Sequence, residues 1–172
     1  NGALISFIGS LITSVETVTT FIVSPFIFND DKVISIEENS SATNDALINK
    51  ELKTFNQVIS PKMLGTITIG SLLQKDEVEF MILFSSMQTL FGGAGQGDYT
   101  AGNSFMDTYC KCLQSNGINA KTVNWPGWSE TGMAVDFQVT DDMVMFKSLT
   151  NRRAIMALHT VITHDITNVV PG

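Results

Sequence analysis

Positive charge is scarce in this 172-residue chain, which has 10 lysines and arginines against 17 aspartates and glutamates. The formal net charge is −7, and Arg152-Arg153 is the only pair of adjacent basic residues. Proteins that bind nucleic acid neutralise phosphate groups with clustered lysine and arginine side chains. The composition therefore argues against nucleic acid as a partner.

Cysteine and histidine are also scarce, with two of each. Cys110 and Cys112 lie two apart in a stretch with helical spacing, where their side chains point in different directions. His159 and His164 offer no ligand spacing with them, and structural zinc sites need such pairs. No metal site is expected. Two thiols without a signal peptide indicate a reducing, cytoplasmic location.

The chain lacks an uninterrupted apolar run long enough for a membrane. Residues 3–28 are largely apolar, but Glu16 lies in the middle and Pro25 near the end. A spanning helix needs about 20 consecutive apolar residues. We expect buried core or a surface for a neighbouring unit, and no membrane association. Residues 1–31 stay unassigned. Because the chain begins at Asn1 rather than at methionine, we expect a fragment of a longer protein.

No phosphate-binding motif is complete. In GGAGQG, residues 92–97, the nearest approach to G-x-G-x-x-G starts at Gly93 and ends on Asp98, and no Gly-Lys-Ser/Thr follows. Asp98 at the start of the next helix would also repel a pyrophosphate bound at that helix terminus. The hydrolase motif G-x-S-x-G is missing around Ser85 and Ser86, so a hydrolase is disfavoured.

Strand and helix patterns alternate from residue 32 onward, which predicts an α/β fold with a parallel sheet. The run at 79–84 is almost continuously apolar, as in a strand buried on both faces. Pro61 is expected to end one helix and open the next. The predicted strands are 32–36, 79–84, 119–124 and 168–170, and the predicted helices are 45–59, 62–73, 98–114, 141–148 and 151–161.

Polar residues follow the buried strand. Ser86 ends it, and ligands of α/β sheets bind beyond the carboxyl ends of strands. Tyr99 lies in the first turn of the next helix, and Asn103 is one turn further on the same face. The glycine-rich loop between them lets the backbone fold back, so that serine and tyrosine can face one substrate atom. Alternation points Ser85 to the other face, which makes it the weaker candidate.

Together with Lys62 in FNQVISPKMLGT, this constellation resembles a short-chain dehydrogenase/reductase. It is most similar to the ketoreductase domain of modular polyketide synthases and hybrid peptide synthetases. Most short-chain dehydrogenases have lysine four residues after the tyrosine, whereas these ketoreductases have asparagine there and a lysine in an earlier helix. NWPGWSETGMAVD and FKSLTNRRAIMAL also look like the family, and the resemblance covers roughly residues 44–170. It implies a Rossmann-like parallel sheet with flanking helices, with residues 32–172 as the catalytic part of the domain.

The resemblance assigns a role to each site residue. A phenol with a pKa near 10 is a poor acid at neutral pH unless its anion is stabilised. Tyr99 would donate the proton, and Lys62 would lower the pKa of that tyrosine. Ser86 would donate a hydrogen bond to the ketone oxygen, and Asn103 would position the others.

The resemblance also implies a cofactor and partners. NADPH would be bound by Lys62, Tyr99, Pro126 and Gly127, and the substrate would be a ketoacyl thioester on an acyl or peptidyl carrier protein, delivered by its phosphopantetheine arm. Neighbouring synthase domains are further expected partners. The cofactor half of the family, with G-x-G-x-x-G after its first strand, has no counterpart here. Residues 37–40, EENS, replace a His-Ala-Ala-Gly-like turn. A non-catalytic structural module is therefore the alternative.

Two tryptophans close to the expected site allow two interpretations. Trp125 and Trp128 flank the Pro-Gly pair in NWPGW. They could be walls of a substrate pocket or could pack in a lid.

Overall fold

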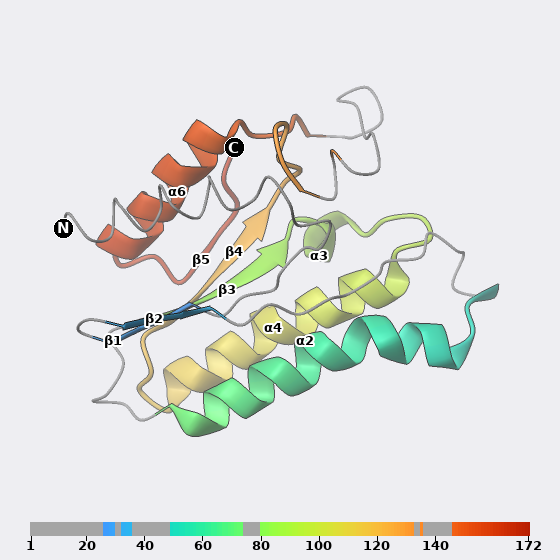
Figure 1. Ribbon diagram of the computed structural model, residues 1–172, viewed down its shortest axis with the longest axis horizontal. Helices are drawn as coiled ribbons and strands as arrows, with labels where there is room; N and C mark the ends of the chain where they lie inside the picture. Colours follow the sequence, from blue (N-terminus) through green and yellow to red (C-terminus); the bar gives the residue numbers. More distant parts are fainter. Residues whose placement is uncertain (1–25, 30–31, 36–48, 74–79, 133–134, 136–145) are drawn as a thin grey trace.

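The computed structural model describes residues 26–29, 32–35, 49–73, 80–132, 135 and 146–172. Several predictions lie outside these residues: those for the apolar segment at 1–25, the turn at 37–40 and most of the helix at 141–148. Within the described part, one sheet has the strand order β2-β1-β3-β4-β5 (Figure 1). The strands are β1 (Phe26–Asn29), β2 (Lys32–Ser35), β3 (Phe80–Ser86), β4 (Ala120–Trp125) and β5 (Asn168–Val169).

The half of the sheet that carries the candidate site is parallel. β3 pairs with β4, and β4 with β5, in parallel register, as the alternation of strands and helices predicts. β1 lies in the segment left unassigned and runs antiparallel to both β2 and β3. β1 and β2 are too close in sequence for a parallel pair, because parallel neighbours need a crossover connection of about a dozen residues.

Helices cover both faces of this sheet, which confirms the predicted fold class. α2 (Leu52–Leu72) and α4 (Gly97–Ser115) lie on one face, and α6 (Asn151–Thr163) lies on the other (Figure 1). A short helix, α3 (Gln88–Phe91), follows β3. None of the helices in the described ranges is long and apolar enough to cross a membrane.

Successive side chains of β3 pack alternately into two separate hydrophobic cores, one on each face of the sheet. Met81 and Leu83 pack with Met106 of α4, in the cluster that α2 also joins. Phe80 and Ile82 belong to the second cluster, on the α6 side of the sheet. Since successive side chains of a strand point to opposite faces, the continuous apolar run of β3 is what a strand covered on both faces requires.

The predicted helix break at Pro61 is wrong. α2 continues through Pro61 without interruption. Proline has no N–H, so the carbonyl of Gln57 loses its helical partner. Val58 and Lys62, on either side of the proline, are nevertheless both buried. Burial along the side of α2 that packs on α4 outweighs the local cost and keeps one continuous helix.

A lysine joins the sheet to the end of α6. Lys121 of β4 is 5% exposed, and its Nζ donates to the carbonyl oxygens of Val161 and His164, each at 2.7 Å. The last carbonyls of a helix have no intrahelical partner and carry partial negative charge. Burial lowers the pKa of the Lys121 ammonium, and Asp165 opposes that shift. The two hydrogen bonds satisfy both the cation and the end of the helix.

Candidate active site

The candidate site lies at the carboxyl ends of β3 and β4. The parallel register pairs Ser86 with Trp125, and the N–H of Met87 donates to the carbonyl of Trp125 at 3.0 Å. Pro126 and Gly127 follow β4 directly, so the register alone brings them to the same edge as Ser86. This is the edge at which α/β sheets bind their ligands.

Ser86, Tyr99 and Asn103 come together there. Tyr99 is half-buried in the first turn of α4 and is engaged in side-chain hydrogen bonding with Ser86 and Asn103. Asn103 is 1% exposed, and its Nδ2 also donates to the carbonyl of Tyr99 at 2.8 Å. Ser86 Oγ accepts from the N–H of Gln88 at 3.2 Å, at the end of β3. The serine and the tyrosine can therefore reach one substrate oxygen.

The pKa of Tyr99 is higher than the sequence led us to expect. Burial raises the pKa of the phenol above its ordinary value, and the hydrogen bonds with Ser86 and Asn103 lower it only in part. The net shift is upward because desolvation outweighs the hydrogen bonds that favour the anion. A protonated phenol at neutral pH is nevertheless what a proton donor requires.

Lys62 reaches Tyr99 from the neighbouring helix. Its side chain is 2% exposed on α2, and its Nζ lies 5.2 Å from the centroid of the Tyr99 ring, in a cation–π arrangement. The aliphatic stem passes Gly102 of α4, where an added Cβ would lie 2.7 Å from Lys62 Cδ. Because Gly102 has no side chain, the stem of Lys62 has room to pass α4 and reach Tyr99.

A buried asparagine of β4, which the sequence analysis did not single out, connects residues of the site through hydrogen bonds. Asn124 of β4 is 1% exposed, and Ser85 Oγ, one of its partners, in turn donates to the carbonyl of Asn103 at 3.4 Å. An asparagine at the end of a predicted strand, where α/β sheets bind their ligands, is the signal in the sequence that could have revealed this network. Four acceptors lie within hydrogen-bonding distance of the two N–H groups of Asn124 Nδ2: Asp107 Oδ2 (2.8 Å), Thr89 Oγ1 (2.9 Å), Ser85 Oγ (3.2 Å) and the carbonyl of Ser86 (3.3 Å).

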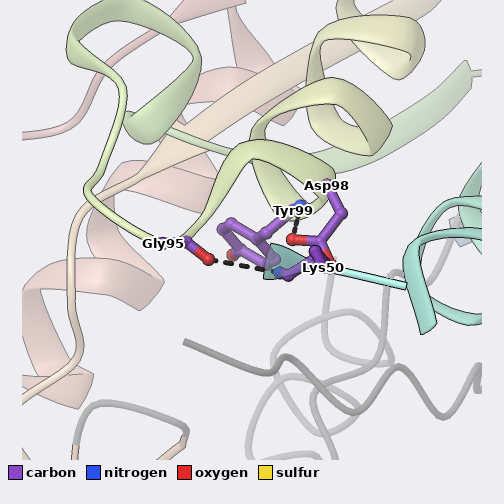
Figure 2. A network of polar contacts seen from close by, with 4 residues as sticks. All are labelled: Lys50, Gly95, Asp98 and Tyr99. Atoms are coloured by element: carbon purple, nitrogen blue, oxygen red, sulfur yellow. Dashed lines mark hydrogen bonds and ion pairs between the residues drawn. The ribbon is translucent and has the colours of Figure 1, made fainter. Parts of the chain in front are cut away.

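A buried ion pair adjoins Tyr99 (Figure 2). Lys50 Nζ lies 2.6 Å from Asp98 Oδ2, and both side chains are 1% exposed. The other oxygen of Asp98 accepts from the N–H of Tyr99 at 2.8 Å. Asp98 was expected to repel a phosphate, but Lys50 neutralises its charge. The exclusion of a phosphate loop therefore rests on the incomplete motif alone.

The structure places Trp125 in a core, which neither of the two interpretations predicted. It is 7% exposed and belongs to the core on the α6 side of the sheet. Its ring centroid lies 5.4 Å from that of Phe84 and 5.2 Å from that of Trp128. Trp128 packs against the same core. Trp125 is a packing residue, and Trp128 contacts it edge-on.

The described residues hold no cluster of three or more histidine, cysteine, aspartate or glutamate side chains that could bind a metal ion. The residues present fit one end of a nicotinamide cofactor. The ammonium of Lys62 and the hydroxyl of Tyr99 are suitable partners for ribose hydroxyls. Gly127 is exposed and has no side chain to obstruct a flat ring. The chain has no G-x-G-x-x-G motif for the pyrophosphate.

Comparisons with known proteins point to one family. The family model for the KR domain matches residues 32–130. The cluster 41 polyketide synthase of Aspergillus flavus is 31% identical over 130 residues, which cover 74% of this chain but 12% of the synthase. The chain therefore spans only a small part of this relative.

Solved structures share the fold. An A-type ketoreductase from a modular polyketide synthase matches with a TM-score of 0.70 and 26% identity, over 77% of this chain and 28% of that chain. A small-chain dehydrogenase in complex with NADPH matches with a TM-score of 0.59 over 77% of this chain and 69% of that chain. At 18% identity, this second match shows the fold alone.

Proposed function

The chain belongs to the KR domain family, the ketoreductase domains of polyketide synthases, and we propose that it carries the catalytic residues of such an enzyme. The proposed reaction is the NADPH-dependent reduction of a ketoacyl thioester to the hydroxyacyl thioester, in polyketide or hybrid peptide biosynthesis. The observation that carries the proposal is the convergence of Ser86, Tyr99, Asn103 and Lys62 at the carboxyl edge of the sheet.

The chain's own residues supply the proton and orient the ketone. Ser86 Oγ donates a hydrogen bond to the ketone oxygen, and Tyr99 donates its proton to the same oxygen as the carbonyl becomes an alcohol. A bound nicotinamide cofactor supplies the hydride for the carbonyl carbon. Lys62 and Tyr99 would hold its ribose, and the Pro126-Gly127 backbone would lie against its nicotinamide.

Lys62 has its largest effect after the proton has left. Burial disfavours the Tyr99 phenolate, so the anion needs compensation within the site. The ammonium of Lys62, 5.2 Å from the ring centroid, and the hydrogen bonds of Ser86 and Asn103 all favour the charged form. We infer that these three side chains make an otherwise poor acid usable, because they stabilise its anion as it forms.

We propose that the substrate arrives on the phosphopantetheine arm of an acyl or peptidyl carrier protein. Support comes from the relatives, which are multidomain synthases of which the chain covers only a small share, 12% in the Aspergillus flavus protein. Residues 32–172 would be the catalytic part of the domain, with neighbouring synthase domains as further partners. The two free cysteines suit a reducing compartment such as the cytoplasm.

The test is NADPH oxidation by the natural full-length protein with a small ketoacyl thioester. The Tyr99→Phe variant should lose about 10²- to 10⁴-fold in kcat, the usual contribution of a general acid. Tyr109→Phe is the matched control, because Tyr109 lies on the same helix but stacks on Phe105 at 5.7 Å between centroids. Full turnover in Tyr99→Phe would overturn the assignment. A folded wild-type protein that neither binds NADPH nor reduces the ketone would favour the structural alternative.

A further inference from the structure

The ion pair of Lys50 and Asp98 joins three segments of the site. Lys50 lies just before α2, the helix that carries Lys62, and Asp98 lies in the first turn of α4 next to Tyr99. Lys50 Nζ also donates to the carbonyl of Gly95, at 3.2 Å, in the glycine-rich loop. One ammonium group thus holds the start of one helix, the loop and the start of the second helix (Figure 2).

The backbone of the loop is shaped for this contact. Gly95 has φ 74°, a left-handed conformation that side chains disfavour. Its carbonyl accepts from Lys50, while Asp98 Oδ1 accepts from the N–H of Tyr99 at 2.8 Å. The glycine-rich loop leads from α3, which follows Ser86, to Tyr99, and glycine has the largest backbone freedom to lose. The contacts of Lys50 at the end of the loop nearer Tyr99 therefore fix where the first turn of α4, and with it Tyr99, is placed.

We propose that Lys50 and Asp98 are positioning residues for ketone reduction, which hold Tyr99 at its working distance from Ser86 and Lys62. This rests on the proposed function. Lys50 and Asp98 need not touch the substrate or the cofactor. A displacement of about 1 Å at a catalytic group can cost about 10²-fold in rate.

A purely structural role would leave a different signature. Replacing both members of a buried ion pair with uncharged residues is often neutral for stability, whereas removing one member leaves an unpaired buried charge. The double variant Lys50→Met/Asp98→Asn should therefore regain most of the thermal stability that either single variant loses. It should not regain the rate, because the tether from α2 to the loop and α4 is still missing.

The experiment compares wild type, both single variants and the double variant in the natural full-length protein, with kcat, KM and Tm measured for each. We expect each single variant to lose about 10- to 100-fold in kcat with KM changed less than about threefold. The double variant should keep the low kcat at a recovered Tm. Lys53→Met is the matched control, since Lys53 is exposed in the first turn of α2, and it should behave as wild type.

Amide hydrogen exchange gives a readout that does not depend on turnover. A peptide covering residues 93–103 should exchange faster in Lys50→Met and in the double variant than in Lys53→Met. A double variant with wild-type kcat, or unchanged exchange in this peptide, would overturn the proposal. If Tyr99→Phe kept full turnover, the proposed function would fail, while the exchange comparison would still decide whether Lys50 holds the segment that contains Tyr99.

Discussion

Gly102 offers a sharp test of how Lys62 reaches the site. A Cβ at this position would lie 2.7 Å from Lys62 Cδ and 3.5 Å from Lys62 Cβ. In Gly102→Ala, Lys62 Cδ must retreat by about 0.7 Å to restore the 3.4 Å at which ordinary contact begins. Because Lys62 is 2% exposed, its stem has little free space, and the ammonium moves with it.

The expected effects on rate and on stability differ. We expect Gly102→Ala to lose roughly three- to tenfold in kcat and Gly102→Val roughly 100-fold, scaled from the cost of about 1 Å of misplacement. Overpacking costs about 1–3 kcal/mol, but alanine is about 1 kcal/mol better than glycine within a helix. The net loss of unfolding free energy in Gly102→Ala should therefore stay below about 2 kcal/mol.

Gly70 provides the control, because a Cβ there would lie 2.6 Å from Tyr109 Cε1. It belongs to the same contact between α2 and α4 and faces neither Lys62 nor Tyr99. Gly70→Ala should thus suffer similar overpacking without losing turnover. The assays are urea unfolding and NADPH-dependent reduction, both in the full-length protein. Equal kcat in Gly102→Val and wild type, or equal losses in the Gly70 and Gly102 variants, would refute the idea that the glycine clears a path for the lysine.

Two further predictions concern buried polar groups. Asn124→Ala should lower the free energy of unfolding in urea by about 2–3 kcal/mol, because the Asp107 carboxylate loses a buried donor at 2.8 Å; a loss below 0.5 kcal/mol, the usual size of a surface substitution, would contradict the network. Burial, with Asp107 adding to it, raises the pKa of Cys110 from 9.0 to about 12. Its thiol should therefore stay unmodified by iodoacetamide at pH 8 while the exposed Cys112 reacts, as mass spectrometry of the native protein would show. Alkylation of native Cys110 at the rate of Cys112 would contradict the raised pKa. The same shift implies that the stability contributed by the buried thiol is complete below pH 9 and is lost as the pH rises towards 12, which urea unfolding at pH 8 and pH 11 would test.

Local patterns predicted the elements that carry the site. The apolar run of β3 and the helical spacing of α4 are visible in a few neighbouring residues, so both elements were predicted within two residues of their observed ends. Pro61 was misleading, because its local cost is offset by contacts with a helix that begins 36 positions later. Packing of this kind leaves no local pattern in a single sequence.

Some residues of the candidate site could likewise be predicted from the sequence, and others could not. Ser86, Tyr99, Asn103 and Lys62 could be chosen because their spacing resembles a family motif. Lys50 could not, since its partner is 48 residues away and neither residue belongs to that motif. The raised pKa of Tyr99 was also beyond the sequence, because it depends on how completely the fold removes water from the ring.

The two hydrogen bonds of Lys121 bear on where this unit can be divided. The family model ends its match at residue 130, yet β4, the strand that leads to Pro126, holds an ammonium group whose partners are the carbonyls of Val161 and His164. A chain cut at the end of the match would lose both acceptors of Lys121 and the helix that covers this face of the sheet. The unit that folds as one piece therefore extends at least to residue 164, because β4 and the end of α6 depend on each other for these hydrogen bonds.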